Sequence, residues 1–124
     1  MEFTKSELEV LNVLWQSHRP LSRNEILTLS TNKTWKDSSI HILLNSLLKK
    51  GALQEAGFVK SGKTWGRLYA AIISCEEYFA TNVFVPGGKV IMPLISTMIN
   101  SGSLTNDMVE KIFEMIEKRK RQLE

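Results

Sequence analysis

The sequence contains a single cysteine, Cys75, among its 124 residues. One cysteine forms no internal disulfide and cannot supply the several thiolates of a structural zinc site. Long hydrophobic runs are missing too: a run such as residues 90–95, which contains Pro93, is far shorter than the ~20 residues that cross a bilayer. Met1 leads into a polar helix start rather than a signal peptide. These absences predict a cytoplasmic protein with no metal, no cofactor and no membrane insertion.

Signatures of catalysis are also missing. The chain shows no nucleophile–base pair, no carboxylate pair and no glycine-rich loop of the kind that holds phosphate. Its two histidines, His18 and His41, are too few and too far apart for a metal site. The composition, 43% hydrophobic and 23% charged, is that of an ordinary folded domain. We therefore expect a binding protein rather than an enzyme.

Charge is distributed unevenly along the chain, which carries a net charge of +3. Residues 1–73 hold ten Lys or Arg and six Asp or Glu, for a net +4. Residues 74–124 hold six and seven, for a net −1. A basic N-terminal half is compatible with a nucleic-acid partner, because it would attract the phosphate backbone.

The N-terminal part reads as three helices joined by short connections. Thr4 and Glu7 form a capping box that starts the first helix, and Ser22 and Glu25 start a second, shorter one. A polar turn leads to the third helix, predicted over residues 35–50, with Asp37 or Ser38 as its cap and Gly51 as its stop signal. Three such helices in this order are typical of a helix-turn-helix unit.

The third helix has two different faces. Its apolar face, at helical spacing, consists of Ile40, Leu43, Leu44, Leu47 and Leu48. The opposite face presents the predicted DNA-base contacts, which are Ser38, Ser39, His41, Ile42 and Asn45. Asn45 can pair with adenine through two hydrogen bonds, and Ile42 can contact a thymine methyl group. Because no Arg or Lys precedes Lys49 on this face, we expect an operator rich in A·T pairs.

A change of period after Gly51 predicts a β-hairpin. Residues 52–59 and 64–71 alternate like strands around the turn at residues 61–63. A hairpin directly after three helices is the wing of a winged helix. The predicted phosphate contacts lie on this hairpin and around the third helix, and are Lys36, Lys49, Lys60, Lys63 and Arg67.

Residues 74–124 read as further helices. One begins at Ser74, and the last starts at about Thr105. Between them a helix is predicted from Lys89 to about Asn100, which starts near Met92 or kinks there because Pro93 is tolerated only in a first turn. About fifty residues cannot hide this much apolar surface by themselves, so we expect a homodimer. The predicted interface residues are Ile91, Leu94, Ile95, Met98, Met108, Ile112 and Ile116. The expected fold is mainly α with a small β-hairpin: a winged helix-turn-helix over residues 1–73 and a helical dimerisation region over residues 74–124.

The chain resembles the penicillinase-repressor family (BlaI/MecI/CopY type) over essentially its whole length. The matching residues are Leu8–Leu11, Leu14–Trp15, Pro20–Ser22, Glu25–Ile26, Trp35, Leu47–Gly51, Tyr69 and Ser74–Tyr78. The resemblance implies a dimeric bacterial repressor that binds operator DNA. In one branch it also implies a membrane sensor-protease that cuts the dimerisation region, at a point that falls near Thr97–Met98 here.

This chain departs from the family pattern in three places, the first of which is the cleavage point: the Asn-Phe bond of the better-studied members falls near Thr97–Met98 here. The Lys, Thr and Arg residues usual at the front of the third helix are replaced by short or neutral residues, and the Cys-x-Cys pairs of the copper-sensing branch are missing. Two functions therefore stay open: a DNA-binding repressor, and a winged-helix module that contacts proteins, for which exposed Ile42 is the main argument. Cys75 is either a small buried residue or a redox-sensitive thiol in the first turn of a helix.

Overall fold

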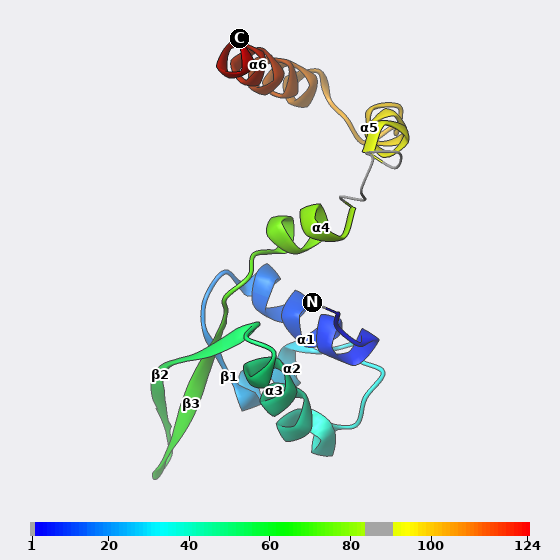
Figure 1. Cartoon of the computed structure of the whole chain (residues 1–124). Helices are drawn as coiled ribbons and strands as arrows, with labels where there is room; N and C mark the ends of the chain where they lie inside the picture. Colours follow the sequence, from blue (N-terminus) through cyan, green and yellow to red (C-terminus); the bar gives the residue numbers. More distant parts are fainter. Residues whose placement is uncertain (1, 84–90) are drawn as a thin grey trace. The chain divides into compact units, whose positions relative to one another are not determined.

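The computed structural model describes residues 2–83 and 91–124 and divides into two compact units, Met1–Ala80 and Thr81–Glu124 (Figure 1). The first unit contains α1 (Lys5–Ser17), β1 (Leu21–Ser22), α2 (Arg23–Leu29), the 3-10 helix η1 (Asp37–Ser39), α3 (Ile40–Lys49), β2 (Leu53–Ser61) and β3 (Thr64–Ala71). Helix α4 (Cys75–Val83) crosses the division, and the second unit contains α5 (Ile91–Ile99) and α6 (Asn106–Leu123). Three helices followed by a hairpin confirm the predicted winged helix.

Both predicted capping boxes are confirmed. The Thr4 hydroxyl accepts a hydrogen bond from the Glu7 amide at 3.2 Å, and the Glu7 carboxylate accepts one from the Thr4 amide at 2.8 Å. Ser22 and Glu25 make the same reciprocal pair at the start of α2, at 3.2 and 3.0 Å. Each N-cap side chain is worth about 1 kcal/mol, because it satisfies amides that have no partner within the helix.

A three-stranded antiparallel sheet carries the wing, in the order β1-β3-β2. The predicted hairpin is confirmed, although β2 extends to Ser61 and shortens the turn. A bulge between Glu55 and Phe58 interrupts the register, and Gly57 there has φ +117°, which glycine adopts without steric cost. The sequence did not predict β1, because its two residues are too few to show an alternating pattern.

The core of the first unit is built from all three helices and the sheet. Its buried side chains are Val10, Leu11, Leu14, Leu21, Ile26, Trp35, Ile40, Leu44, Leu47, Ala52 and Leu53. The predicted apolar face of α3 is confirmed, with Ile40, Leu44 and Leu47 fully buried and the other two leucines partly buried. Burying a side chain of this size contributes about 1.5–3 kcal/mol, so α3 is held with its opposite face outward.

The predicted extent of the third helix, residues 35–50, is wrong at its start. The α-helix begins only at Ile40, after the 3-10 turn of η1. Neither Asp37 nor Ser38 caps α3: the Asp37 carboxylate instead pairs with Lys33 at 2.7 Å, and the N-cap residue makes no side-chain hydrogen bond. Trp35 lies in the core at 9% exposure, so the backbone before the helix is fixed by packing rather than by capping.

The predicted stop of the third helix at Gly51 is confirmed. Gly51 has φ +77°, and its amide donates to the Leu48 carbonyl at 3.1 Å. The amide of Ala52 donates to the Leu47 carbonyl at 3.0 Å. These two bonds form a Schellman motif, which turns the chain from α3 into the first strand of the wing.

The first turns of α4 belong to the N-terminal unit. The helix starts as predicted, with the Ser74 hydroxyl accepting from the Glu77 amide at 3.0 Å. The Tyr78 ring lies 5.9 Å from Trp15 and 5.5 Å from Phe3, measured between ring centroids. This aromatic contact explains why the compact unit extends to Ala80, beyond the boundary at residues 73 and 74 that the sequence suggested.

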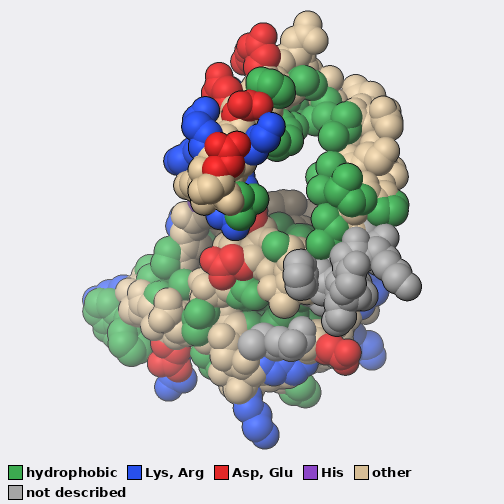
Figure 2. Space-filling view, turned by 45° about the horizontal axis from the view of Figure 1, so that its top comes forward, with side chains coloured by type: hydrophobic (Ala, Val, Ile, Leu, Met, Phe, Trp, Pro, Cys, Tyr) green, Lys and Arg blue, Asp and Glu red, His purple; other side chains and the backbone are tan. Residues whose placement is uncertain are grey.

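The second unit consists of two amphipathic helices. Pro93 is the third residue of α5, within its first turn as expected, and the Thr105 hydroxyl caps α6 by accepting from the Met108 amide at 3.2 Å. No residue of either helix is buried, and Figure 2 shows hydrophobic side chains on the surface of this unit.

The predicted interruption at residues 83–88 lies almost entirely outside the described residues. Within the described parts of the chain, no helix has the length and apolar character that a membrane span requires.

Candidate nucleic-acid interface

The outward face of α3 carries the predicted base-contact residues. His41, Ile42 and Asn45 are exposed on the helix, and the Ile42 side chain is 71% exposed. Ser38 and Ser39 lie in the turn of η1 that leads into α3, where Ser38 is exposed and Ser39 is partly buried. The five residues therefore line one solvent-facing side of the segment, at the spacing of successive helical turns.

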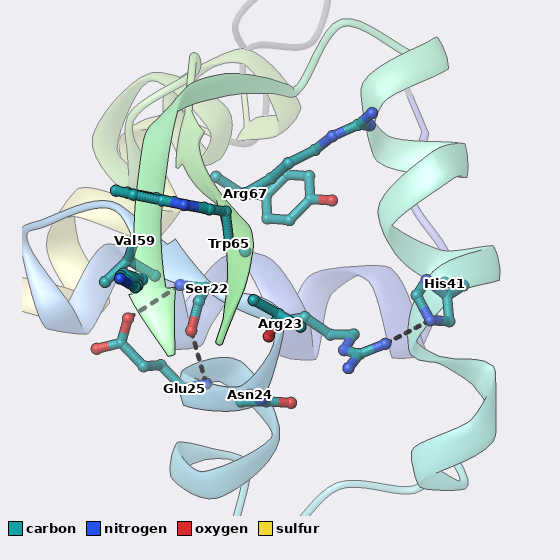
Figure 3. Close-up of a pocket in the computed structure, with 12 residues that line it drawn as sticks. Ser22, Arg23, Asn24, Glu25, His41, Val59, Trp65 and Arg67 are labelled. Carbon is teal, nitrogen blue, oxygen red and sulfur yellow. Dashed lines mark hydrogen bonds between the residues drawn. The ribbon is translucent and has the colours of Figure 1, made fainter. Parts of the chain in front are cut away.

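An arginine from another helix joins this face. Arg23 is the first residue of α2, and its Nη1 atom lies 2.7 Å from Nε2 of His41 (Figure 3). Both side chains are exposed. The basic contacts predicted from the sequence lie only around the third helix and on the hairpin, and they do not include Arg23. The signal that could have found it is the capping box at Ser22, which puts the next residue on the exposed first turn of α2.

A groove of about 470 Å³ separates α2 and α3 from the wing (Figure 3). Its charged lining residues are Arg23, Glu25, Lys60 and Arg67, and His41 lines the same groove. Glu25 is held by the Ser22 amide at 3.0 Å and by Arg19 at 2.7 Å, and these two contacts lower the pKa of its carboxyl group. Because Arg19 neutralises the only acidic group among the lining residues, the groove favours an anion.

The wing presents cations and exposed aromatic side chains, which include Phe58 at 64% exposure. Lys60 and Lys63 are exposed close to the turn, where Gly62 has φ +64°. Trp65 lies directly across the hairpin from Lys60 and is 66% exposed. Trp65 is not among the contacts predicted from the sequence, although the alternation of β3 puts it on the same face as Arg67. A cationic and aromatic surface of this kind fits a nucleic-acid backbone and its sugars.

The predicted phosphate contacts differ in how far they are already neutralised. Arg67 pairs with Glu55 at 2.8 Å. Among the residues that the structure describes, Lys36, Lys49, Lys60 and Lys63 form no ion pair. These four lysines are therefore the better candidates for sequence-independent anchoring.

A buried carboxylate fixes the far end of α3. Glu7 of α1 is 2% exposed and accepts hydrogen bonds from Lys50 and Ser46, each at 2.6 Å. Burial alone would raise the pKa of Glu7, but the bonds from Lys50, Ser46 and Thr4 outweigh it and lower the pKa to about 2. The sequence predicts only the capping-box role of Glu7, because its partners in α3 lie about forty residues further along the chain.

Comparison with known proteins gives one consistent family. The family model described as the penicillinase repressor matches residues 3–118. The penicillinase repressor of Bacillus licheniformis is 25% identical over 126 residues, which cover 96% of this chain and 92% of that protein. The methicillin resistance regulatory protein MecI of Staphylococcus aureus is 23% identical over 123 residues, covering 95% of each chain. Among solved structures, Bacillus subtilis PadR in complex with operator DNA has a TM-score of 0.49 at 20% identity, covering 94% of this chain and 70% of that one.

Proposed function

Since this chain belongs to the penicillinase repressor family and is a transcriptional repressor rather than an enzyme, we propose that it acts by binding operator DNA as a homodimer in the cytoplasm. In this proposal, α3 enters the major groove and the wing follows the adjacent backbone. The observation that carries it is the outward face of α3, which has the buried leucines behind it and the basic groove and wing beside it. An α-helix with a rigid apolar back and hydrogen-bonding front fits the major groove of B-DNA.

The chemistry of each side chain on this surface indicates whether it contacts a phosphate or a base. Lys36, Lys49, Lys60 and Lys63 would contact phosphates, which position the protein without reading sequence. Asn45 and Ile42 would read bases, through the two hydrogen bonds that adenine offers and the methyl group of thymine. Ser38 and Ser39 would contact bases or sugars near the start of α3.

Dimerisation is proposed through the second unit. Along α5 and α6, large apolar side chains stay exposed: Ile95 at 42%, Met98 at 58%, Met108 at 43% and Ile116 at 57%. Ile91, Leu94 and Ile112, the other predicted interface residues, are partly buried. Apolar surface on this scale is unusual for a monomer and is covered most simply by a second copy of the same surface.

We propose as a second step, after operator binding, that a membrane sensor-protease relieves repression by cutting the chain. Thr97 and Met98, near the cleavage point that the family resemblance implies, are both exposed on α5. Cutting α5 there would separate its last residues and α6 from the rest of the chain, and would thereby weaken the dimer.

One observation favours a different function, in which α3 contacts a protein. Ile42 is 71% exposed at the centre of the outward face, where an apolar side chain would suit a protein partner as well as a thymine methyl group. This alternative predicts no preference among DNA sequences.

Binding to the DNA upstream of the protein's own gene tests the proposal. Fluorescence anisotropy would compare that DNA with a scrambled duplex of equal length and base composition, at one fixed salt concentration. We expect binding to the upstream DNA to be tighter by about 10³ or more, the usual margin between specific and non-specific sites. Equal affinity for the two duplexes would contradict operator binding and favour the protein-contact alternative.

A further inference from the structure

The contact between Arg23 and His41 links two helices on the outward face of the first unit. Arg23 Nη1 and His41 Nε2 are 2.7 Å apart, and both side chains are exposed. A guanidinium group offers only donors, so Nε2 of His41 is the acceptor in this contact. The bond fixes the guanidinium of Arg23 beside the second residue of α3.

The remaining N–H donors of the Arg23 guanidinium are available to bind another group. An arginine has five N–H donors in a planar fork, and His41 takes one of them. In the described part of the chain no carboxylate pairs with Arg23, whereas Arg19 and Arg67 each pair with a glutamate. Arg23 therefore keeps both its charge and most of its donors.

The position of this fork favours a base over a phosphate. Residues near the start of a recognition helix are those that contact base edges, and His41 is the second residue of α3. The commonest specific contact to a base is an arginine with two hydrogen bonds to O6 and N7 of guanine. Arginine also binds phosphate through two hydrogen bonds, so the position of Arg23 beside the start of α3, rather than the fork alone, favours a base.

We propose that Arg23 is a specificity-determining residue that reads one guanine in each half of the operator, and that His41 is its positioning residue. This inference rests on the proposed operator binding. It adds to the operator rich in A·T pairs that the sequence predicts: the residues of α3 itself still favour A·T pairs, and Arg23 adds one required G·C pair beside them.

The test uses the full-length protein and the operator sequence obtained by selection from random duplexes. Its affinity is measured for this operator and for variants in which each base pair is replaced in turn. Arg23→Lys keeps the positive charge but loses the planar set of guanidinium donors. We therefore expect its affinity for non-specific DNA to stay within about twofold of that of the unaltered protein. The preference for guanine at one position of each half-site should fall by about tenfold. His41→Ala should weaken the same preference, and His41→Gln, whose amide oxygen can still accept from Arg23, should restore part of it. The matched control Arg19→Lys, whose partner is Glu25, should leave the preference unchanged.

Two outcomes would overturn the inference. If Arg23→Ala weakens binding to every duplex alike and lowers the salt slope by about one, Arg23 contacts a phosphate and reads no base. If neither Arg23→Lys nor His41→Ala changes any base preference, the pair has no part in recognition. Failure of the unaltered protein to prefer any duplex is a separate result that contradicts the proposed function itself.

Discussion

The ammonium group of Lys50 lies 2.6 Å from a carboxylate oxygen of Glu7, and this ion pair joins the C-terminal end of α3 to the first turn of α1. The Glu7 side chain is 2% exposed and that of Lys50 is 34% exposed. Ser46 donates a second hydrogen bond to the same carboxylate from one turn earlier in α3. The helix proposed to enter the DNA groove is therefore held by a charged contact as well as by its leucines.

Replacing Glu7 should change how stability depends on pH. The pKa of Glu7 is about 2 in the folded chain, below its ordinary value of 4.5, so the folded state binds this proton less readily than the unfolded state. The stabilisation is complete above about pH 4.5 and disappears as the pH falls towards about 2. It amounts to roughly 3 kcal/mol, because the two pKa values differ by about 2.5 and each pKa unit corresponds to about 1.36 kcal/mol. Urea unfolding at a series of pH values should show Glu7→Gln less stable at pH 7 and less sensitive to acid.

The control for this measurement is Glu76→Gln, which is exposed on α4. Parallel curves of unfolding free energy against pH for Glu7→Gln and the unaltered chain would contradict this role of Glu7.

Placing charges on α6 should dissociate the dimer. Ile112→Asp combined with Ile116→Asp would put two carboxylates into the proposed apolar interface, where they cannot be hydrated. We expect the unaltered chain to sediment as a dimer at micromolar concentration and the double variant as a monomer. Operator affinity should fall by about tenfold or more, because the two half-sites are no longer bound together. Glu114→Gln, on the same helix, should leave the dimer intact. A monomeric unaltered chain would refute the proposed interface.

Lys63→Ala should weaken binding to all duplexes to the same extent. Lys63 is exposed at the turn of the wing and forms no ion pair among the described residues. A phosphate contact releases counterions, so its loss should lower the slope of log K against log salt by about one unit. Titrations at several salt concentrations measure this slope, with Lys118→Ala on α6 as the control. A loss confined to one sequence would instead mean that Lys63 reads bases.

Asn45→Ala should remove the preference for adenine at one position of each half-site. Asn45 is exposed on α3, one helical turn after His41, and its amide can make two hydrogen bonds to adenine that are worth about 1–3 kcal/mol of discrimination. Affinity for non-specific DNA should remain nearly unchanged, since the phosphate contacts are intact. Competition binding with single-base operator variants would measure the effect. Retained preference at every position would remove Asn45 from the base-reading set.

The sequence predicted those features of the fold that depend on neighbours along the chain. The capping boxes at Thr4 and Ser22, the stop at Gly51 and the wing hairpin all rest on residues within a few positions of each other. It failed at the start of α3, where burial of Trp35 outweighs the capping preference of Asp37.

The candidate site was only partly predictable for the same reason. Periodicity identifies the outward face of α3, because the buried and exposed positions alternate within one helix. Arg23 and Glu7 reach α3 from 18 and 43 residues away in the chain, at His41 and Lys50. No local pattern contains such contacts, since tertiary packing brings these residues together.

Selection of binding sites from a pool of random duplexes tests the central claim most directly, because it assumes nothing about which genes are controlled. A dimer that reads DNA through two copies of α3 should recover two inverted half-sites, with centres about one helical turn or a multiple of it apart. Each half-site should be rich in A·T pairs and contain one fixed G·C pair. Recovery of such a sequence would support the repressor mechanism proposed for this chain, and recovery of no common sequence would contradict it.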